Sequence, residues 1–538
     1  MMGIFMKLLQ RIRERGSICT LAIAGEAQRV LGLPLTFIGT HRQAVEHFKQ
    51  KLIIPSELRG RVVISALRNR SWIGVAVYTA CVLRQMGYEA TLLYRGSEMS
   101  RFFPSRMKRF DFCSGVADIP GIELVDLEAI HISEQEMDDF AAVARQFAPS
   151  ALAYNLHVEE QDVREGDPEI QGKLQELILL MMRMGAATRK ILGQNNYHRF
   201  ILYSGLIGES PVMLDCAQRL SVHTVCLEGW AWRHGHLIYN HNAPALDYDI
   251  QSWLNKIQPW DDEKDQQVKR YSNFLEGGYT GGSEWLDNLY SVQRSQVSAS
   301  LPENLREFVQ EGQRVFLVAP NVIGDSSTLM RETIFSGQQK WIIALIEYFR
   351  GKPEAKLLIR AHPAELWAQS KVRIRMAEVA RRHAQGAKNI YIIDAEEELN
   401  TFTLLPFVQV GLVWLSSVGV DMVIRGVPVI AAARPKYTGL GIVEEPTSTK
   451  QYFELLDEWI RSSKRPSPQQ VMMAKQYLYI VFKGFSYEAW SKNTFVTGCR
   501  LNAMPNQAEH DAFYQALVGE QPNYAVPPPA DQSAQLHV

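Results

Sequence analysis

Residues 408–435 read VQVGLVWLSSVGVDMVIRGVPVIAAARP, and this stretch decides the fold class. An apolar run is followed by two serines, then by residues with helical spacing up to Gly426, and then by a second apolar run that stops at Pro435. A strand, a helix and a strand in this order predict two parallel strands joined by a right-handed crossover. Runs that are apolar throughout indicate strands buried on both faces by helices. The stretch therefore predicts an α/β domain.

The same alternation continues toward the N-terminus. It predicts strands in QRVFLVAPN (313–321), AKLLIRAHP (355–363) and NIYIID (389–394), with helices near 338–350, up to about His383, and near 397–405. An earlier series of the same kind contains the strands RVVISAL (61–67), YEATLLY (88–94), RFILYSG (199–205) and HTVCLEG (223–229), with helices over 71–87 and 171–192. Two Rossmann-like domains facing a central cleft are therefore expected, with helical extensions at both ends.

The expected boundaries follow from these two series and from composition. We predict an N-terminal helical extension over residues 1–55, a first Rossmann-like domain over 56–300, a second over 301–465, C-terminal helices over 466–500, and a mostly disordered tail over 501–538.

Composition excludes several classes of protein. Hydrophobic residues make up 46% and charged residues 21% of the 538 residues, as in a globular protein. The 57 basic and 58 acidic residues nearly cancel, so no global field attracts nucleic acid. The six cysteines include no C-x-x-C pair, which argues against a zinc site or a disulfide framework and favours the cytoplasm. We expect no bound metal.

Membrane contact is expected at most at the N-terminus. No run of about 20 apolar residues predicts a spanning helix. The first 15 residues, MMGIFMKLLQRIRER, are apolar first and basic afterwards, which is the reverse of a secretory signal. Such a segment is either a plain surface helix or a basic amphipathic helix lying on the inner membrane.

Two candidate phosphate-binding features follow strands of the second domain. His362 and Pro363 come directly after an apolar strand, where the imidazole can donate a hydrogen bond to a phosphate oxygen and Arg360 can add charge. The second feature is a turn before a helix, whose hydroxyls and free N–H groups suit an anion, formed by Ser416, Ser417 and Gly419. A simple strand-ending turn and an ordinary helix N-cap are the structural alternatives. Together the two features suggest a nucleotide phosphate as leaving group.

Other candidates also lie at strand ends. Glu228, followed by Gly229, is a candidate general base if it faces the cleft, and a surface carboxylate otherwise. In the loop RPKYTGLG (434–441), Arg434 can bind an anion and Tyr437 offers a face to a base or sugar. The loop from Arg68 to Gly74 follows the first strand, where doubly wound sheets bind ligands.

One further motif is weak, and two common nucleotide-binding motifs are absent. The pair Asp247 and Asp249 forms a D-x-D sequence that can hold a metal in a different fold, but this pattern is common by chance. No G-x-x-x-x-G-K-[ST] or G-x-G-x-x-G sequence is present, so ATP hydrolysis and dinucleotide redox chemistry lose their usual support.

The second domain also resembles a known family. RAHPAE (360–365), the acidic strand end at Asp394, and SSVGVDMVIRGVPVIAAARPKYTGLGIV (416–443) are similar in order and spacing to the capsule polysaccharide biosynthesis family, which includes bacterial Kdo transferases. The resemblance is clear over about residues 355–445. It implies a GT-B glycosyltransferase that needs no cofactor beyond its nucleotide-sugar substrate.

The resemblance also implies roles for individual residues. His362 and Pro363 would contact the donor nucleotide, Ser416 and Ser417 its phosphate, and Glu228 would be the base of an acceptor domain. The family usually has an acidic-Asp-Gly motif where this chain has Leu227-Glu228-Gly229.

The predicted function is an inverting, metal-independent transfer of a sugar from a nucleotide-activated donor, CMP-Kdo-like or other. The acceptor would be a growing capsular or surface polysaccharide or its lipid-linked precursor. Two alternatives stay open. One is a CDP-polyol phosphotransferase of the teichoic-acid type, and the other is a non-catalytic capsule export or assembly protein.

Overall fold

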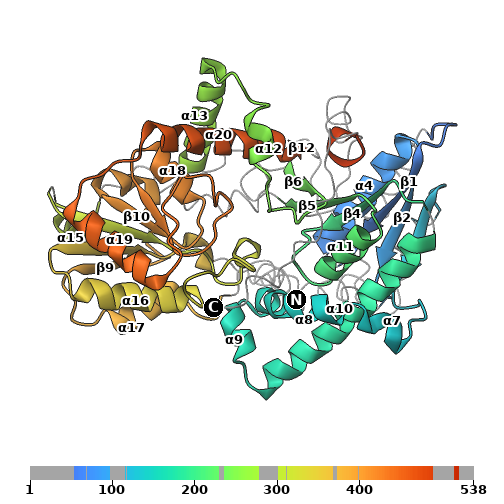
Figure 1. Cartoon of the computed structure of the whole chain (residues 1–538), viewed down its shortest axis with the longest axis horizontal. Coiled ribbons are helices and arrows are strands. Elements are labelled where there is room, and N and C mark those ends of the chain that lie inside the picture. The colour runs from blue at the N-terminus through green and yellow to red at the C-terminus, as the bar shows by residue number, and fades with distance from the viewer. Residues whose placement is uncertain are drawn as a thin grey trace, which may run out of the picture.

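The chain forms two α/β halves that lie side by side in a computed structural model (Figure 1). The structure describes residues 54–67, 70–96, 116, 118–194, 196–229, 236–277, 301–310, 312–366, 372–397, 399–488 and 514–519. In this part of the chain no helix is both long enough and apolar enough to cross a membrane.

The first half is built on a seven-stranded sheet. Its order is β12-β6-β5-β4-β1-β2-β3. The strands are β1 (Gly60–Ser65), β2 (Tyr88–Tyr94), β3 (Ile122–Asp126), β4 (Arg199–Tyr203), β5 (Thr224–Gly229), β6 (His236–His241) and β12 (Ser486–Glu488). Strands β3, β2, β1, β4 and β5 pair in parallel, whereas β6 is antiparallel to both of its neighbours.

Helices cover both faces of this sheet because its strands are apolar on both sides. One face packs against α4 (Arg70–Gln85) and the buried residues Ala516, Leu517 and Val518. The other face packs against α8 (Ala141–Leu156), α10 (Pro168–Gln194) and α11 (Ser210–Arg219). Met181 and Met184 of α10 are fully buried, so these methionines belong to the core.

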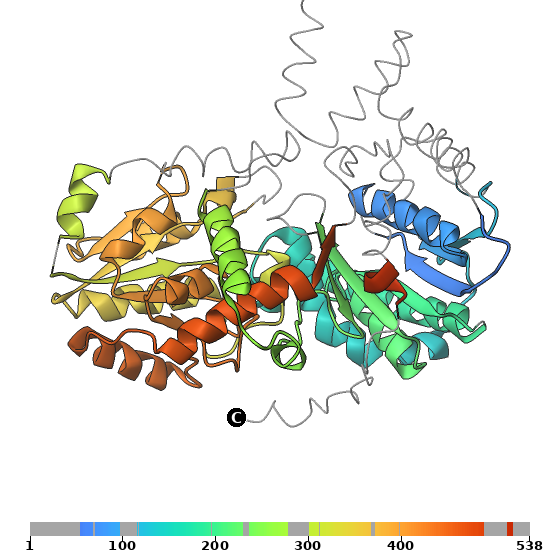
Figure 2. The ribbon, with the colours of Figure 1, turned by 90° about the horizontal axis from the view of Figure 1, so that it is seen from above.

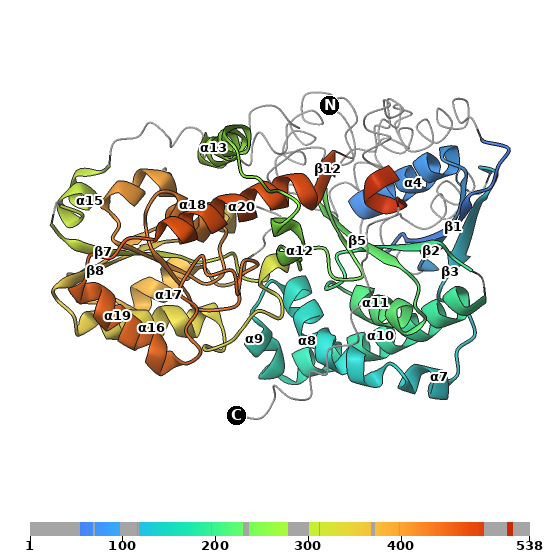
Figure 3. The same ribbon diagram turned by 45° about the horizontal axis from the view of Figure 1, so that its top comes forward.

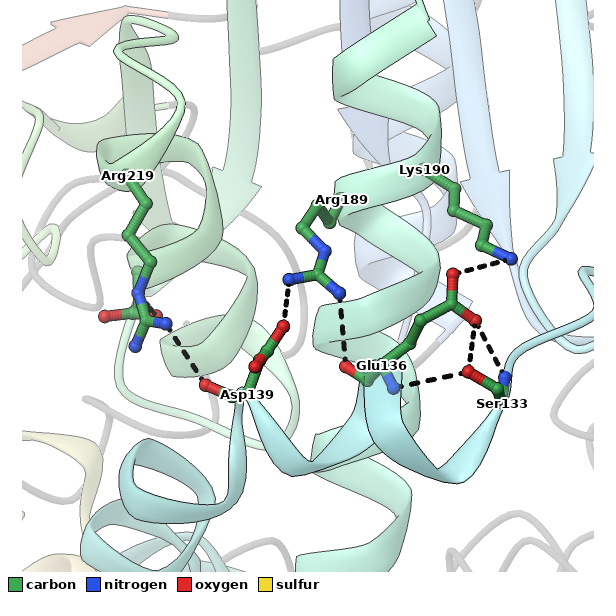
Figure 4. A network of polar contacts seen from close by, with 7 residues as sticks. Ser133, Glu136, Asp139, Arg189, Lys190 and Arg219 are labelled. Atoms are coloured by element: carbon green, nitrogen blue, oxygen red, sulfur yellow. Dashed lines mark hydrogen bonds and ion pairs between the residues drawn. The ribbon is translucent and has the colours of Figure 1, made fainter.

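A short helix, α7 (Glu134–Asp138), is fastened to the long helix α10 (Figure 4). Ser133 and Glu136 form a capping box, in which each side chain accepts a hydrogen bond from the other residue's backbone N–H. Glu136 also pairs with Lys190 at 2.9 Å, and Asp139 pairs with Arg189. These contacts hold the outer helical layer of the first half to its core.

The second half is a five-stranded parallel sheet. Its order is β11-β10-β7-β8-β9. The strands are β7 (Arg314–Ala319), β8 (Ala355–Arg360), β9 (Ile390–Ile393), β10 (Val410–Val413) and β11 (Val429–Ala431). One face is covered by α16 (Gln338–Arg350), α17 (Met376–His383) and α19 (Thr449–Arg461), and the other by α18 (Val418–Ile424) and α20 (Pro468–Gly484). Helix α15 (Glu303–Phe308) precedes β7.

The chain returns from the second half to the first at its C-terminal end. Helix α20 runs from the second half toward the first sheet, where β12 pairs with β6 (Figures 2 and 3). Helices α12 (Gln251–Leu254) and α13 (Asp262–Gly277) lie against α20. The two halves are therefore joined by more than the single connection before α15.

The fold class predicted from the sequence is confirmed, since the architecture is α/β with two Rossmann-like sheets. Two details of the prediction were wrong. The helix expected near 397–405 is replaced by the 3₁₀ turns η3 (Thr401–Thr403) and η4 (Leu405–Phe407), because the Asn400 side chain accepts the Phe402 N–H at 2.9 Å and Pro406 follows. The pattern after α20 also contains a strand, β12.

The N-terminal segment, Arg68 and most of the predicted tail lie outside the described residues. Of the tail, residues 514–519 are described, and they contain a helical turn packed on the first sheet.

Candidate functional site

The strand order of the second sheet creates a natural binding crevice. From β7 the chain proceeds to β8 and β9 on one side and then to β10 and β11 on the other. The point of reversal lies between β7 and β10, and open α/β sheets bind ligands beyond the strand ends at such a point. The two loops are linked there, because the Asn321 side chain accepts the Leu415 N–H at 3.3 Å.

His362 lies at the same edge of this sheet, directly after β8. Its Nδ1 accepts a hydrogen bond from the Ala364 N–H at 3.1 Å, so the proton of the neutral ring is on Nε2. Burial lowers the pKa of His362 to about 4, so the ring is neutral at physiological pH. Pro363 begins the 3₁₀ turn η2 (Pro363–Leu366) that supplies the Ala364 N–H. The imidazole can therefore donate a hydrogen bond from its Nε2–H group.

The turn after β10 that contains Ser416 and Ser417 is held in place by Tyr437. The Tyr437 hydroxyl donates to the carbonyl oxygen of Ser416 at 2.8 Å, and the ring is almost completely buried. A Cβ on Gly419 would lie 2.5 Å from this hydroxyl, so glycine is required for the contact. Ser417 stands at the N-cap position of α18 without a capping hydrogen bond from its side chain. Its hydroxyl is not used to cap the helix.

The sequence suggested that Tyr437 offers its ring to a base or sugar. The ring is buried instead and does not face a ligand. Arg360 has a structural role in addition to its charge. Its guanidinium is buried and donates to three backbone carbonyls, those of Asp394, Glu397 and Leu399. It fixes the segment after β9, and its charge also helps to lower the pKa of His362.

Glu228 is the most deeply buried carboxylate of the candidate set. It lies near the end of β5 and is 7% exposed. Its Oε1 accepts a hydrogen bond of 2.6 Å from Ser326, which belongs to the 3₁₀ turn η1 (Ser326–Thr328) after β7 of the other sheet. Oε2 is buried as well, and the Ser204 hydroxyl also hydrogen-bonds to this carboxylate. Loops from the carboxyl ends of both sheets therefore meet at Glu228.

Burial raises the pKa of Glu228 above that of an ordinary glutamate. The hydrogen bond from Ser326, the nearby Lys436 and the hydrogen bond from Ser204 act in the opposite direction and favour the carboxylate. Asp325 opposes its ionisation.

Lys436 is the cation of the second domain that faces Glu228. Burial lowers its pKa, while Glu228 and Asp325 oppose this effect because both are negative and close. Arg434, which the sequence favoured, is exposed and donates to the carbonyl oxygen of Met330 at 3.0 Å. Of the two basic residues of this loop, Lys436 is the one whose charge acts on Glu228.

One acidic residue, Asp325, lies close to the other charged groups of the site. It raises the pKa of His362 as well as that of Glu228 and Lys436. The site therefore contains a buried carboxylate, a neutral imidazole and an ammonium group around one aspartate. Asp325 and Ser326 were missed in the sequence because the loop after β7 has no periodic pattern.

The remaining candidate residues lie in ordinary structural positions. Gly229 is the exposed last residue of β5 and pairs with Leu237. Gly74 lies within α4. Asp247 forms an ion pair with Arg331, and Asp249 accepts the Ser252 N–H at 3.2 Å, so the D-x-D residues have separate structural roles. No cluster of three metal-binding side chains occurs among the described residues.

A small cavity of about 20 Å³ lies between the domains, close to the site. Its acidic lining residues are Glu159 and Glu160 from the first half and Glu332 from the second. Burial raises the pKa of both Glu159 and Glu332 to about 7. No sequence motif had drawn attention to these carboxylates.

Comparison with known proteins finds one family model that matches the second half. Residues 287–474 match the family model described as capsule polysaccharide biosynthesis protein. The resemblance found in the motifs is confirmed. No curated protein matches the chain significantly.

Several solved structures are similar at low identity. The Thermosulfurimonas dismutans KpsC beta-Kdo 2,7 transferase is 14% identical over 54% of this chain and 79% of that one, with a TM-score of 0.32. The putative UDP-N-acetylglucosamine 2-epimerase of Listeria monocytogenes is 11% identical over 78% and 93%, with a TM-score of 0.25. The sucrose-phosphate synthase of Thermosynechococcus elongatus is 10% identical over 79% and 95%, with a TM-score of 0.28. At such scores they assign no substrate to this chain.

Proposed function

We propose that this chain is a glycosyltransferase that moves a sugar from a nucleotide-activated donor to a capsular or surface polysaccharide, or to its lipid-linked precursor. The main support is the position of Glu228. This buried carboxylate at a strand end of the first sheet faces Ser326 and Lys436 of the second. The family match of the second half supports the process, and the arrangement of the site supports the chemistry.

The donor would bind at the crevice of the second sheet. The Nε2–H of His362 would donate to a phosphate oxygen, and the ammonium group of Lys436 would balance the charge that develops on the leaving phosphate. Ser416 and Ser417 border the same crevice with hydroxyls that are half-buried. These groups need no metal ion to stabilise the leaving group.

The acceptor hydroxyl would be activated by Glu228. A new bond forms from the acceptor oxygen to the anomeric carbon while the bond from that carbon to the phosphate oxygen breaks. The hydroxyl proton passes to Oε2 of Glu228, and the nucleotide leaves with the electron pair of the broken bond. Attack opposite the leaving group inverts the anomeric configuration. A cytoplasmic location and contact with the inner membrane stay predictions from the sequence.

The first test is nucleotide binding. CMP, CDP, UDP and GDP are added to the wild type and to His362→Ala, with His383→Ala, an exposed histidine on α17, as the matched control. A ligand present at about 100 times its Kd stabilises the folded state by about 2.7 kcal/mol. We expect one nucleotide to raise the melting temperature of the wild type and the control but not of His362→Ala.

The outcome separates the alternatives. A response to CMP fits a CMP-sugar donor, whereas a response to CDP with turnover of a CDP-polyol would favour the phosphotransferase. A lack of response to every nucleotide would contradict the proposal and favour an assembly protein without catalytic activity.

A further inference from the structure

We infer that Ser326 is a positioning residue for Glu228, so that the general base is complete only when the loop after β7 lies against the end of β5. This inference rests on the proposed function. The two residues are 98 positions apart and belong to different sheets, yet the Ser326 hydroxyl donates to Oε1 of Glu228 at 2.6 Å. A catalytic group on one domain is thus oriented by the other.

The turn that carries Ser326 is itself well fixed. The Asp325 carboxylate accepts the Ser327 N–H at 2.8 Å, and the Asp325 carbonyl accepts the Thr328 hydroxyl at 2.8 Å. Because the turn is closed by its own hydrogen bonds, the Ser326 hydroxyl has a defined direction. A rigid donor of this kind can hold a carboxylate in one orientation.

The hydrogen bond also determines which oxygen of Glu228 can act. Oε1 is engaged by Ser326, so Oε2 is the oxygen left for the acceptor. The Ser204 hydroxyl of the first half also hydrogen-bonds to this carboxylate. An acceptor hydroxyl entering the cleft would approach Oε2 and, in the reaction, give it the proton.

Two charged residues face Glu228, and they act in opposite directions. Lys436 favours the carboxylate and Asp325 disfavours it. The nearby Tyr248 and Cys226 stay neutral because burial raises the pKa of both. Loss of Ser326 should therefore raise the pKa of Glu228, and loss of the Asp325 charge should lower it.

The test compares three variants. Ser326→Ala removes the hydroxyl, Ser326→Thr keeps it, and Asp325→Asn removes a charge but keeps an oxygen for the Ser327 N–H. The pKa of Glu228 is measured by infrared difference titration against Glu228→Gln, which needs no substrate. The acid limb of the kcat/KM profile is measured with the donor found in the nucleotide panel.

We expect Ser326→Ala to move both the titration and the acid limb to higher pH by about one unit, as loss of a hydrogen bond to a charged group would do. The titration and the acid limb of Ser326→Thr should stay close to those of the wild type. Those of Asp325→Asn should move to lower pH. A general structural disturbance would not give shifts of opposite sign.

Unchanged titrations, or shifts of the same sign in Ser326→Ala and Asp325→Asn, would overturn the inference. Failure of the proposed function gives a different result, namely no donor turnover by the wild type. In that case the infrared titration still decides whether Ser326 orients Glu228.

Discussion

Glu159 of the first half caps helix α16 of the second half through the backbone N–H of Gln338. Its Oε1 accepts this N–H at 2.6 Å and that of Gln339 at 3.2 Å. The N-cap residue of the helix is Gly337, which has no side chain to serve as a cap. A Cβ on Gly337 would lie 2.6 Å from Oε2 of Glu159, so the glycine leaves room for a cap from the other domain.

Burial of this capping carboxylate makes stability depend on pH. Burial raises the pKa of Glu159 from 4.5 to about 7, so the folded state binds its proton more tightly than the unfolded state does. The resulting stabilisation is complete below about pH 4.5 and is lost as the pH rises through 7. Relative to Glu159→Gln, the wild type should therefore lose roughly 2–4 °C of melting temperature between pH 5 and pH 8.

The control for this prediction is Glu176→Gln, an exposed change on α10. Its melting temperature should change with pH in the same way as that of the wild type. If Glu159→Gln also follows the wild type, the carboxylate is not the titrating group at this interface.

The contact between Gly419 and Tyr437 predicts a coupled pair of mutations. Gly419→Ala places a methyl group 2.5 Å from the Tyr437 hydroxyl and should destabilise the protein by about 1–3 kcal/mol. Tyr437→Phe loses the bond to Ser416 and should cost about 1 kcal/mol. In the double mutant the methyl group fits, since the next atoms are 3.5 Å away.

The measurement is a double-mutant cycle by denaturant unfolding. We expect the double mutant to be more stable than the sum of the two changes by about 1 kcal/mol or more. If the two changes in the free energy of unfolding are strictly additive, the serine turn moves away from Tyr437 when the methyl group is added at Gly419.

Arg360 should act on stability and not on nucleotide binding. A lysine in its place keeps the charge but has one terminal nitrogen for three carbonyl oxygens, so Arg360→Lys should cost about 2 kcal/mol or more. The nucleotide Kd should change less than twofold. Arg382→Lys, an exposed change on α17, is the control. If Arg360→Lys raises the nucleotide Kd tenfold at unchanged stability, Arg360 is instead a donor-binding residue.

His362 should stay neutral throughout the physiological range. Because its pKa is lowered to about 4, the ring nitrogen signals should not titrate between pH 5.5 and pH 8, and they should report a proton on Nε2. The folded state disfavours the charged ring, so its protonation costs stability as the pH falls below 6.5. A titration midpoint between 6 and 7 would contradict the assigned environment.

Much of the fold was predictable from sequence because strands of the two sheets are apolar runs separated by helices. The strand at 355–360 and the helix at 338–350 are examples with a clear pattern. β12 was missed because three residues carry no pattern of their own, and its pairing with β6 is set by tertiary packing. The turns after Asn400 replaced a helix because a local side-chain bond competed with it.

The site was predictable only in part. His362 and Glu228 were singled out because one follows a strand and the other lies at the end of one. Arg434 stays a prediction, but the sequence of a loop does not show which of two nearby side chains turns inward, and Lys436 is the one that acts on Glu228. Ser326 could not be found at all, because its partner Glu228 is 98 residues away.

The most direct test of the account is donor turnover by Glu228→Gln. The variant keeps the shape of the side chain and removes its basicity, so transfer of sugar from the donor to a membrane-extracted acceptor should fall by about 10²–10⁴-fold. The nucleotide Kd should stay within about twofold of the wild type, because His362 and Lys436 are unchanged. Transfer at the wild-type rate would contradict the assignment of Glu228 as the base and with it the proposed site.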